Sequence, residues 1–289
     1  MSTTPPRSTS SDHPGRRRST LTILVSLAVT AVVILWSLGV PGFAPDLRAD
    51  LPPGGGPVVL ELFTSQGCSS CPPADRLLTR LGDDPDLSTR VFPLSFHVDY
   101  WNYIGWTDPF SSERWSDRQR VYARAFDSNR VYTPQLVVNG EAECVGSQER
   151  TVDRLVREAL ARKPAGAVHL RLAPGENPNR LRAIADAELV ADVPAAPELW
   201  MALYQKDLTT SVARGENADR TLHNDYVVRQ LSRAFALPGS SADAEGSGEV
   251  TFTLEPSWNR SDLGVVAFLQ DPRTREIHGA ARATLEIMQ

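Results

Sequence analysis

The hydropathy pattern changes once along the chain, near Lys163. From Val58 to that point, short apolar runs alternate with amphipathic stretches, which predicts strands joined by helices and a sheet with parallel pairs. Beyond it, runs with period-two alternation are separated by turns, which predicts strands alone. We therefore expect an α/β domain over residues 58–163 and an all-β, sandwich-like domain over residues 164–289.

The same pattern predicts the individual elements. In the first part, the expected strands are 58–63, 91–97, 135–138 and 142–145, and the expected helices are 73–81, 111–126 and 148–162. In the second part, the expected strands are 167–174, 180–190, 198–208, 249–256, 263–271 and 277–288. Residues 225–237 fit a helix or a strand, and residues 240–248 are expected to form a polar loop.

The amino-terminal region predicts a membrane segment. Residues 21–40 carry no charge, and at 1.5 Å per residue this helix would cross a hydrocarbon core of about 30 Å. Three arginines, Arg16–Arg18, stand just before it, so the positive-inside rule predicts a cytoplasmic tail at residues 1–20 and places the rest of the chain beyond the membrane. The proline- and glycine-rich residues 41–57 are expected to form a linker.

Cleavage of this segment is the alternative to a permanent anchor. The site would be Gly42-Phe43-Ala44, but Pro45 in the next position disfavours cleavage. We therefore expect a membrane-anchored, extracytoplasmic protein, periplasmic or at the cell surface, which is secreted if the segment is cleaved.

Charge and cysteine content exclude two classes of protein. Lys and Arg total 30 against 35 Asp and Glu, so the chain lacks the basic excess of a nucleic-acid-binding protein and no nucleic-acid partner is expected. Three cysteines are too few for a disulfide scaffold in a chain of 289 residues. Their spacing must therefore indicate their role.

Two cysteines form a C-x-x-C motif between a predicted strand and a predicted helix. Cys68 and Cys71 follow the strand 58–63 and precede Pro72, which suits the first turn of a helix. The positive end of a helix lowers the pKa of a cysteine, and two intervening residues allow a reversible disulfide. Downstream, Thr133-Pro134 precedes a predicted strand and is a candidate cis peptide. Taken together, the elements follow the order of a thioredoxin-like fold, in which the cis-proline loop lies against the cysteine pair.

Several longer motifs carry a resemblance to a known family. LELFTSQGCSSCPPAD, SFHVDYWNYIGWTDPF, RQRVYARAF and VYTPQLVVNG resemble those of a family of largely uncharacterised, secreted bacterial proteins of thioredoxin-like fold. The resemblance covers about Val59 to Gly146, and ARGENADRTLHNDYVVRQL resembles the carboxyl-terminal part of that family. It implies a fold and a plausible site but no substrate. The family usually has Phe where this chain has Cys144.

The cysteine pair predicts thiol–disulfide exchange. Cys68, expected to be exposed at the helix start, would be the nucleophile, Cys71 the resolving thiol, and Pro134 a neighbour of the mixed disulfide. A static disulfide and a metal half-site are the alternatives. Zinc would need two more ligands, whereas Cys68, Cys71 and His97 could hold copper.

His97 and Asp99 are further candidates for the site. They stand two residues apart at the end of the predicted strand 91–97, so their side chains share a face. The imidazole could take a proton from the resolving thiol, or the two could form a buried pair that fixes the loop 100–110. This loop carries aromatic side chains that pack over the sheet or line a substrate groove: Trp101, Tyr103, Trp106 and Phe110.

Cys144 is a candidate third thiol. A two-residue turn at Asn139-Gly140 would pair Gln135 with Cys144 and place this thiol beside Pro134. Alternatively, Cys144 is a small buried apolar side chain. A polar cluster in the second part either packs against the first part, contributes to a partner surface or forms a solvated turn: Glu216, Asn217, Arg220 and His223.

These observations predict an extracytoplasmic thiol–disulfide oxidoreductase. Its partners would be a protein or small-molecule thiol or disulfide and, through residues 21–40, the membrane; no organic cofactor is implied. One competing hypothesis is a non-catalytic binding protein on a thioredoxin scaffold with a structural disulfide. The other is a protein that binds or delivers copper.

Overall fold

The computed structural model describes residues 55–285. The predicted cytoplasmic tail, membrane segment and most of the predicted linker lie outside this range. Within it, no helix is long and apolar enough to cross a membrane.

One mixed sheet of eight strands organises the described part of the chain. Its strand order is β13-β12-β7-β10-β2-β1-β3-β4. Four of these strands come from the first half: β1 (Val58–Thr64), β2 (Val91–His97), β3 (Gln135–Val138) and β4 (Ala142–Val145). The other four come from the second half: β7 (Glu198–Gln205), β10 (Val227–Ala236), β12 (Leu263–Gln270) and β13 (Ile277–Thr284).

This shared sheet contradicts the predicted fold class, a thioredoxin-like domain followed by a separate all-β sandwich. β10 pairs with β2 in parallel, with Val227 opposite Ser95, and the Ser95 amide donates to the Tyr226 carbonyl at 2.8 Å. If the first half were a separate domain, β2 would be an edge strand with unpaired backbone groups. β10 provides hydrogen-bond partners for the backbone at one end of β2. The pairing joins residues more than a hundred positions apart, so local hydropathy does not reveal it.

The hydrophobic core is also shared between the two halves. One cluster combines Phe63, Phe96 and Trp115 from the first half with Tyr204 and Phe268 from the second. Beside it, a buried polar contact crosses the same boundary, because Arg118 bonds Glu61 of β1 and the Gln270 side chain of β12. The halves are therefore held together by core packing as well as by the sheet.

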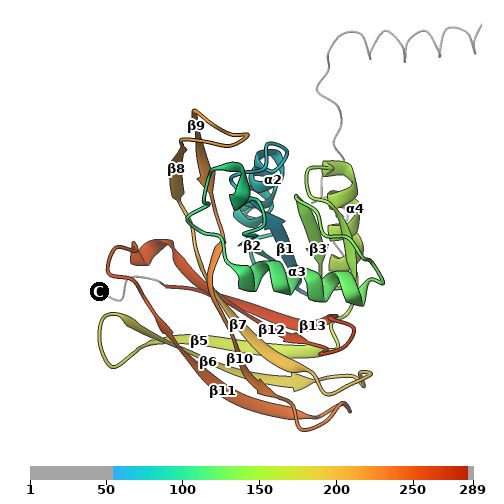
Figure 1. Cartoon of the computed structure of the whole chain (residues 1–289). Coiled ribbons are helices and arrows are strands. Elements are labelled where there is room, and N and C mark those ends of the chain that lie inside the picture. Colours follow the sequence, from blue (N-terminus) through green and yellow to red (C-terminus); the bar gives the residue numbers. More distant parts are fainter. Residues whose placement is uncertain (1–54, 286–289) are drawn as a thin grey trace, which may run out of the picture. The chain divides into compact units, whose positions relative to one another are not determined.

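A second, three-stranded sheet covers part of the large one. It has the order β11-β6-β5 and lies below β7, β12 and β13 in Figure 1. Its strands are β5 (Gly166–Pro174), β6 (Arg180–Leu189) and β11 (Glu245–Thr253). Burial along β6 alternates residue by residue, as expected for a strand with one face on a core. In contrast, every residue of β12 is buried.

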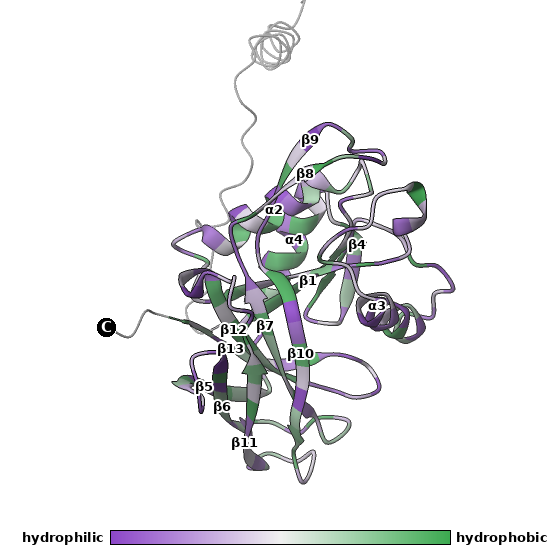
Figure 2. Cartoon of the chain, turned by 60° about the vertical axis from the view of Figure 1, so that its left-hand side comes forward, coloured by the Kyte–Doolittle hydropathy of each residue, from purple (hydrophilic) through white to green (hydrophobic). Residues whose placement is uncertain are grey.

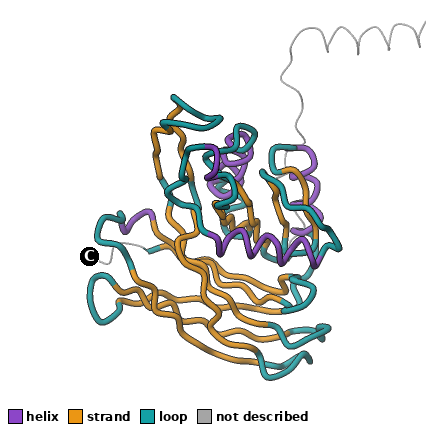
Figure 3. Tube along the Cα trace, in the orientation of Figure 1, coloured by secondary structure: helices purple, strands orange, loops and turns teal. Residues whose placement is uncertain are grey.

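The α-helices of the described part all come from the first half. Figure 3 draws them in purple, together with a short 3₁₀ segment of the second half. They are α2 (Pro72–Asp83), α3 (Glu113–Ala125) and α4 (Glu149–Leu160). Most residues of α3 are hydrophilic in Figure 2, and its few apolar side chains face the shared core. The described residues also contain two short 3₁₀ segments, η1 (Asn102–Ile104) and η2 (Arg260–Asp262).

Strands occupy one ambiguous region of the second half and part of one predicted loop. Residues 225–237, which fit either type of element, contain β10. The predicted polar loop 240–248 is shorter than expected, because β11 begins at Glu245. A separate hairpin of β8 (Leu208–Val212) and β9 (Arg220–Asn224) projects over α2 in Figure 1.

The turn between β3 and β4 shows one prediction confirmed and one wrong. Asn139 and Gly140 have φ of 47° and 69°, as the turn prediction requires. However, Val138 pairs with Ala142, so the loop has three residues and Cys144 lies opposite Leu136 instead of Gln135. Because side chains alternate between faces, this shift of one residue changes the predicted surroundings of Cys144.

Candidate functional site

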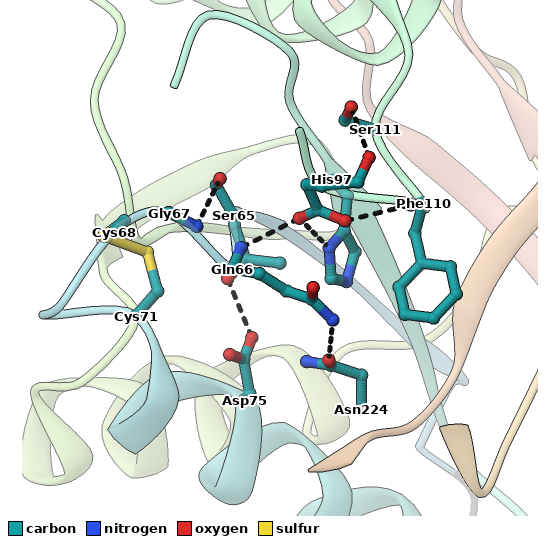
Figure 4. Close-up of polar contacts among 12 residues, drawn as sticks. Ser65, Gln66, Gly67, Cys68, Cys71, Asp75, His97, Phe110, Ser111 and Asn224 are labelled. Carbon is teal, nitrogen blue, oxygen red and sulfur yellow. Dashed lines mark hydrogen bonds and ion pairs between the residues drawn. A yellow bond between two sulfur atoms is a disulfide. The ribbon is translucent and has the colours of Figure 1, made fainter. Parts of the chain in front are cut away.

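The C-x-x-C motif lies between β1 and α2, at the helix start, as predicted. Cys68 and Cys71 form a disulfide, drawn in yellow in Figure 4. Cys71 is the N-cap of α2, and Pro72 is its first residue. The first two residues of α2 are prolines, and the amides of Ala74 and Asp75 both donate to the Cys71 carbonyl. The positive end of the helix dipole therefore lies beside the disulfide, where it favours a thiolate once the bond is opened.

Both cysteines are buried, which corrects the expectation that Cys68 is exposed. The exposed fraction is 1% for Cys68 and 0% for Cys71. The two intervening serines are exposed, and the Ser70 hydroxyl lies 3.3 Å from the Cys68 sulfur. The disulfide is therefore buried, whereas the two serines between its cysteines are exposed to solvent.

The loop between β8 and β9, residues 213–219, is bonded to the backbone around the disulfide. Asn217 is fully buried, and its Nδ2 donates to the carbonyls of Gln66 and Cys68, both at 2.9 Å. Glu216 accepts hydrogen bonds from the Ser69 amide at 2.9 Å and the Ser69 hydroxyl at 2.7 Å. This polar cluster packs against the first half of the chain, one of its three predicted roles.

The remaining members of that cluster support the loop and its hairpin. Arg220 donates to the Asn217 side chain at 3.0 Å, which orients the buried amide. His223 lies further along the hairpin, where its Nε2 is 3.2 Å from Asp225. Of the four cluster residues, only Glu216 and Asn217 bond the C-x-x-C loop itself.

Pro134 lies at the same sheet edge as the disulfide loop. The Thr133–Pro134 peptide bond is cis, as predicted. β3 runs antiparallel to β1 with Gln135 opposite Phe63. Pro134, the residue before β3, therefore lies next to Thr64, the last residue of β1. The Trp101 indole donates to the Thr133 hydroxyl at 2.7 Å, which ties the aromatic loop to this turn.

His97 is paired with Asp108, whereas the sequence placed Asp99 beside it. The His97 Nδ1 lies 2.7 Å from the Asp108 carboxylate, and both side chains are fully buried. Asp108 also accepts the Gln66 amide at 2.8 Å, so it connects the end of β2 with the loop before Cys68. Asp99 accepts from Ser116 of α3 instead.

The charges of this buried pair stabilise each other. Burial opposes the charged form of His97, but Asp108 and its hydrogen bond outweigh burial and raise the pKa of His97. Burial likewise opposes the carboxylate of Asp108, and His97 lowers its pKa overall. The His97 Nε2 is buried without a hydrogen-bond partner among the described residues.

Asp75 is a site residue that the sequence analysis missed. It lies one turn after Cys71 on α2, and its amide donates to the Cys71 carbonyl at 3.1 Å. Burial raises the pKa of Asp75 to about 6, although His97 acts in the opposite direction. Its carboxylate accepts the Thr64 hydroxyl at 2.8 Å. The i, i+4 spacing from Cys71 was the signal that could have identified it.

Cys144 lies in a different environment from the disulfide. It is buried in the cluster that contains Leu62, Ala74 and Leu136, and it forms no disulfide. Burial raises the pKa of its thiol to about 11, so the thiolate is scarce at neutral pH. This environment fits the alternative prediction, in which Cys144 is a small buried apolar side chain.

Residues 55–285 contain no group of three His, Cys, Asp or Glu side chains placed to hold a metal ion. The fold therefore does not gather Cys68, Cys71 and His97 as the copper ligand set considered from the sequence. The aromatic side chains of the loop 100–110 differ in burial. Trp101 packs against the shared core, whereas Tyr103 is 83% exposed.

Comparison with known proteins gives a family and two similar folds. Residues 59–270 match the family described as "Protein of unknown function (DUF1223)". A structural-genomics crystal structure from Agrobacterium tumefaciens is 27% identical with a TM-score of 0.60, over 81% of this chain and 97% of the other. HBP35 of Porphyromonas gingivalis is 19% identical with a TM-score of 0.58, over 80% and 76% of the two chains, which shows a similar fold only. No curated protein matches the chain.

Proposed function

We propose that this chain, which belongs to the DUF1223 family of proteins of unknown function, is a thiol–disulfide oxidoreductase that acts through Cys68 and Cys71. The observation that carries the proposal is the position of the disulfide at the start of α2, one turn before a buried carboxyl group whose pKa is about 6. A purely structural disulfide has no need of such a group. Perturbed buried acids are, in contrast, a common feature of sites that transfer protons.

The exchange reaction uses these groups in sequence. A substrate thiolate attacks the Cys68 sulfur, the Cys68–Cys71 bond breaks, and Cys71 leaves as a thiolate. Asp75, protonated in part of the molecules near pH 6, supplies the proton that Cys71 takes up. A second substrate thiolate then attacks the substrate sulfur of the mixed disulfide, which releases Cys68. The substrate loses two electrons, the cysteine pair gains them, and the reverse sequence reduces a substrate disulfide.

His97 and Asp108 have a positioning role in this proposal. Asp108 bonds both His97 and the Gln66 amide, so the pair sets the backbone two residues before Cys68. The charge of His97 also favours the ionised form of Asp75. The pair therefore tunes the carboxyl group that exchanges a proton with Cys71.

Attack on Cys68 requires the 213–219 loop to move. Cys68 is 1% exposed, and Asn217 bonds its carbonyl. Within residues 55–285, the two strands of this hairpin pair with each other and with no other strand, so displacement of the loop leaves the eight-stranded sheet intact. The buried sulfurs also favour the competing function, a binding protein in which the disulfide is structural.

Redox titration of the purified chain against glutathione, followed by alkylation and mass measurement, separates these functions. A reversible Cys68–Cys71 transition within the glutathione range, above about −270 mV, supports exchange. A disulfide that stays closed below roughly −300 mV supports the structural role. Cys144→Ser serves as the matched control and leaves the midpoint unchanged. Cys71→Ser should trap a substrate as a mixed disulfide on Cys68.

We further propose that the protein acts outside the cytoplasm, anchored through residues 21–40 or secreted after cleavage. The uncharged segment, the arginines before it and the disulfide all support an oxidising compartment. Cell fractionation with amino-terminal sequencing of the mature protein tests this. A soluble cytoplasmic chain that begins at Met1 would refute it.

A further inference from the structure

A cavity lies far along the chain from the disulfide, where three strands reach the same end of the second half. Its walls come from the end of β5, the start of β6 and the end of β13, and its volume is about 700 Å³. Sites for small molecules span roughly 300–1,000 Å³. The side chains that line it include Leu172, Pro178, Leu181, Leu254, Ala283 and Leu285.

The floor of the cavity is part of a hydrophobic core. Leu181 and Leu254 are buried, with exposed fractions of 2% and 3%, and belong to the cluster between the two sheets. Leu172 and Leu285 are partly buried and pack against the same cluster. A ligand in this cavity would therefore contact apolar side chains that continue into the protein interior, and burial of its own apolar surface would drive binding.

Two arginines give the cavity a positive rim. Arg180 donates to the Thr253 hydroxyl at 2.6 Å. Arg260 donates to the Glu255 backbone carbonyl at 3.0 Å and to the Asn179 side-chain oxygen at 3.1 Å. These acceptors are all neutral, and neither arginine forms an ion pair with a carboxylate of residues 55–285. Both guanidinium groups thus keep their charge and further N–H donors for an external anion.

We propose that this cavity binds a fatty acid, with the alkyl chain on the apolar floor and the carboxylate at Arg180 and Arg260. The two features select the same ligand class, because arginine pairs geometrically with a carboxylate and the floor accepts only apolar atoms. A peptide fits less well, since its buried backbone groups would need polar partners that the floor does not offer. The site is independent of the proposed redox function.

Isothermal titration of the full, delipidated chain with dodecanoate below its micellar concentration tests the proposal. We expect one saturable site, and decanoate should bind roughly 15-fold more weakly because it lacks two CH₂ groups. Arg180→Gln combined with Arg260→Gln should weaken dodecanoate at least tenfold and leave the neutral dodecanol unchanged. Arg171→Gln removes a charge from β5 at a residue outside the cavity lining and should have no effect.

Two further variants keep the test decisive. Ala283→Leu fills the cavity and should weaken both dodecanoate and dodecanol, whereas the paired arginine variant affects the anion alone. A chain that ends at Leu285 should bind as the full chain does. The proposal is overturned if the full chain shows no saturable binding, if the arginine variants leave dodecanoate affinity unchanged, or if only the shortened chain binds, because residues 286–289 would then be the occupant.

Discussion

Replacement of Asn217 by alanine should accelerate reduction of the Cys68–Cys71 disulfide in the native protein. The Asn217 amide is fully buried and donates to two backbone carbonyls, those of Gln66 and Cys68, both at 2.9 Å. Its removal leaves both buried acceptors without this donor, at a cost of about 1–1.5 kcal/mol each. The docked loop is then less stable than the displaced loop by about 2–3 kcal/mol.

If reduction of the disulfide requires the displaced loop, this free-energy difference between the docked and displaced loop changes the reduction rate by the same factor as the population of the displaced loop. A shift of 2–3 kcal/mol increases the open population, and hence the reduction rate, by a factor of about 30 to 150. The assay is the rate of reduction by dithiothreitol without denaturant, read by alkylation and mass. The free energy of unfolding, measured with urea, gives the global stability of the same variant.

A matched variant distinguishes local opening from global unfolding. Leu203→Ala, in the core between the two sheets, should lower the free energy of unfolding by about 2–5 kcal/mol without a change in the reduction rate. Glu216→Gln, on the exposed side of the loop, should accelerate reduction less than Asn217→Ala. If Asn217→Ala is reduced at the native rate while Leu203→Ala is reduced faster, the reasoning is refuted.

The remaining predictions concern three buried groups. Asp75 has a raised pKa of about 6, so its contribution to stability is fully present below about pH 4 and declines as the pH rises to 6; Asp75→Asn should abolish this decline and gain up to about 3 kcal/mol at pH 7, by urea denaturation. Asp108→Asn should cost about 3–5 kcal/mol near pH 6, because it leaves His97 buried without its partner. Cys144 should resist iodoacetamide in the native protein at pH 8, measured by mass.

The pKa shifts of His97 and Asp108 determine how the stability that this ion pair contributes depends on pH. The pair's contribution should weaken below about pH 4 as Asp108 is protonated, and as the pH rises through the raised pKa of His97. A stability cost of Asp108→Asn that does not change with pH would argue against the ion pair. An unchanged pH profile in Asp75→Asn, or rapid labelling of Cys144, would contradict the burial assigned to that group.

Local features of the site could be predicted because neighbouring residues determine them. The helix start at Pro72, the cis bond before Pro134 and the left-handed turn at Asn139 depend on residues only a few positions away. The partner of His97 could not be predicted in the same way. Asp99 is two positions away, but the loop after β2 folds back and brings Asp108 into the buried position.

The C-x-x-C pair at a helix start and the short strands and helices around it follow from the sequence alone, because they depend on backbone preferences and hydropathy within one element. Three features of the molecule depend on the packing of the whole chain: one sheet joins both halves, Asp75 is buried, and Asn217 bonds the backbone of Cys68. Asn217 and Cys68 are 149 positions apart. Such contacts depend on which surfaces leave unpaired backbone groups and apolar area to be covered, and this is set only when the whole chain packs.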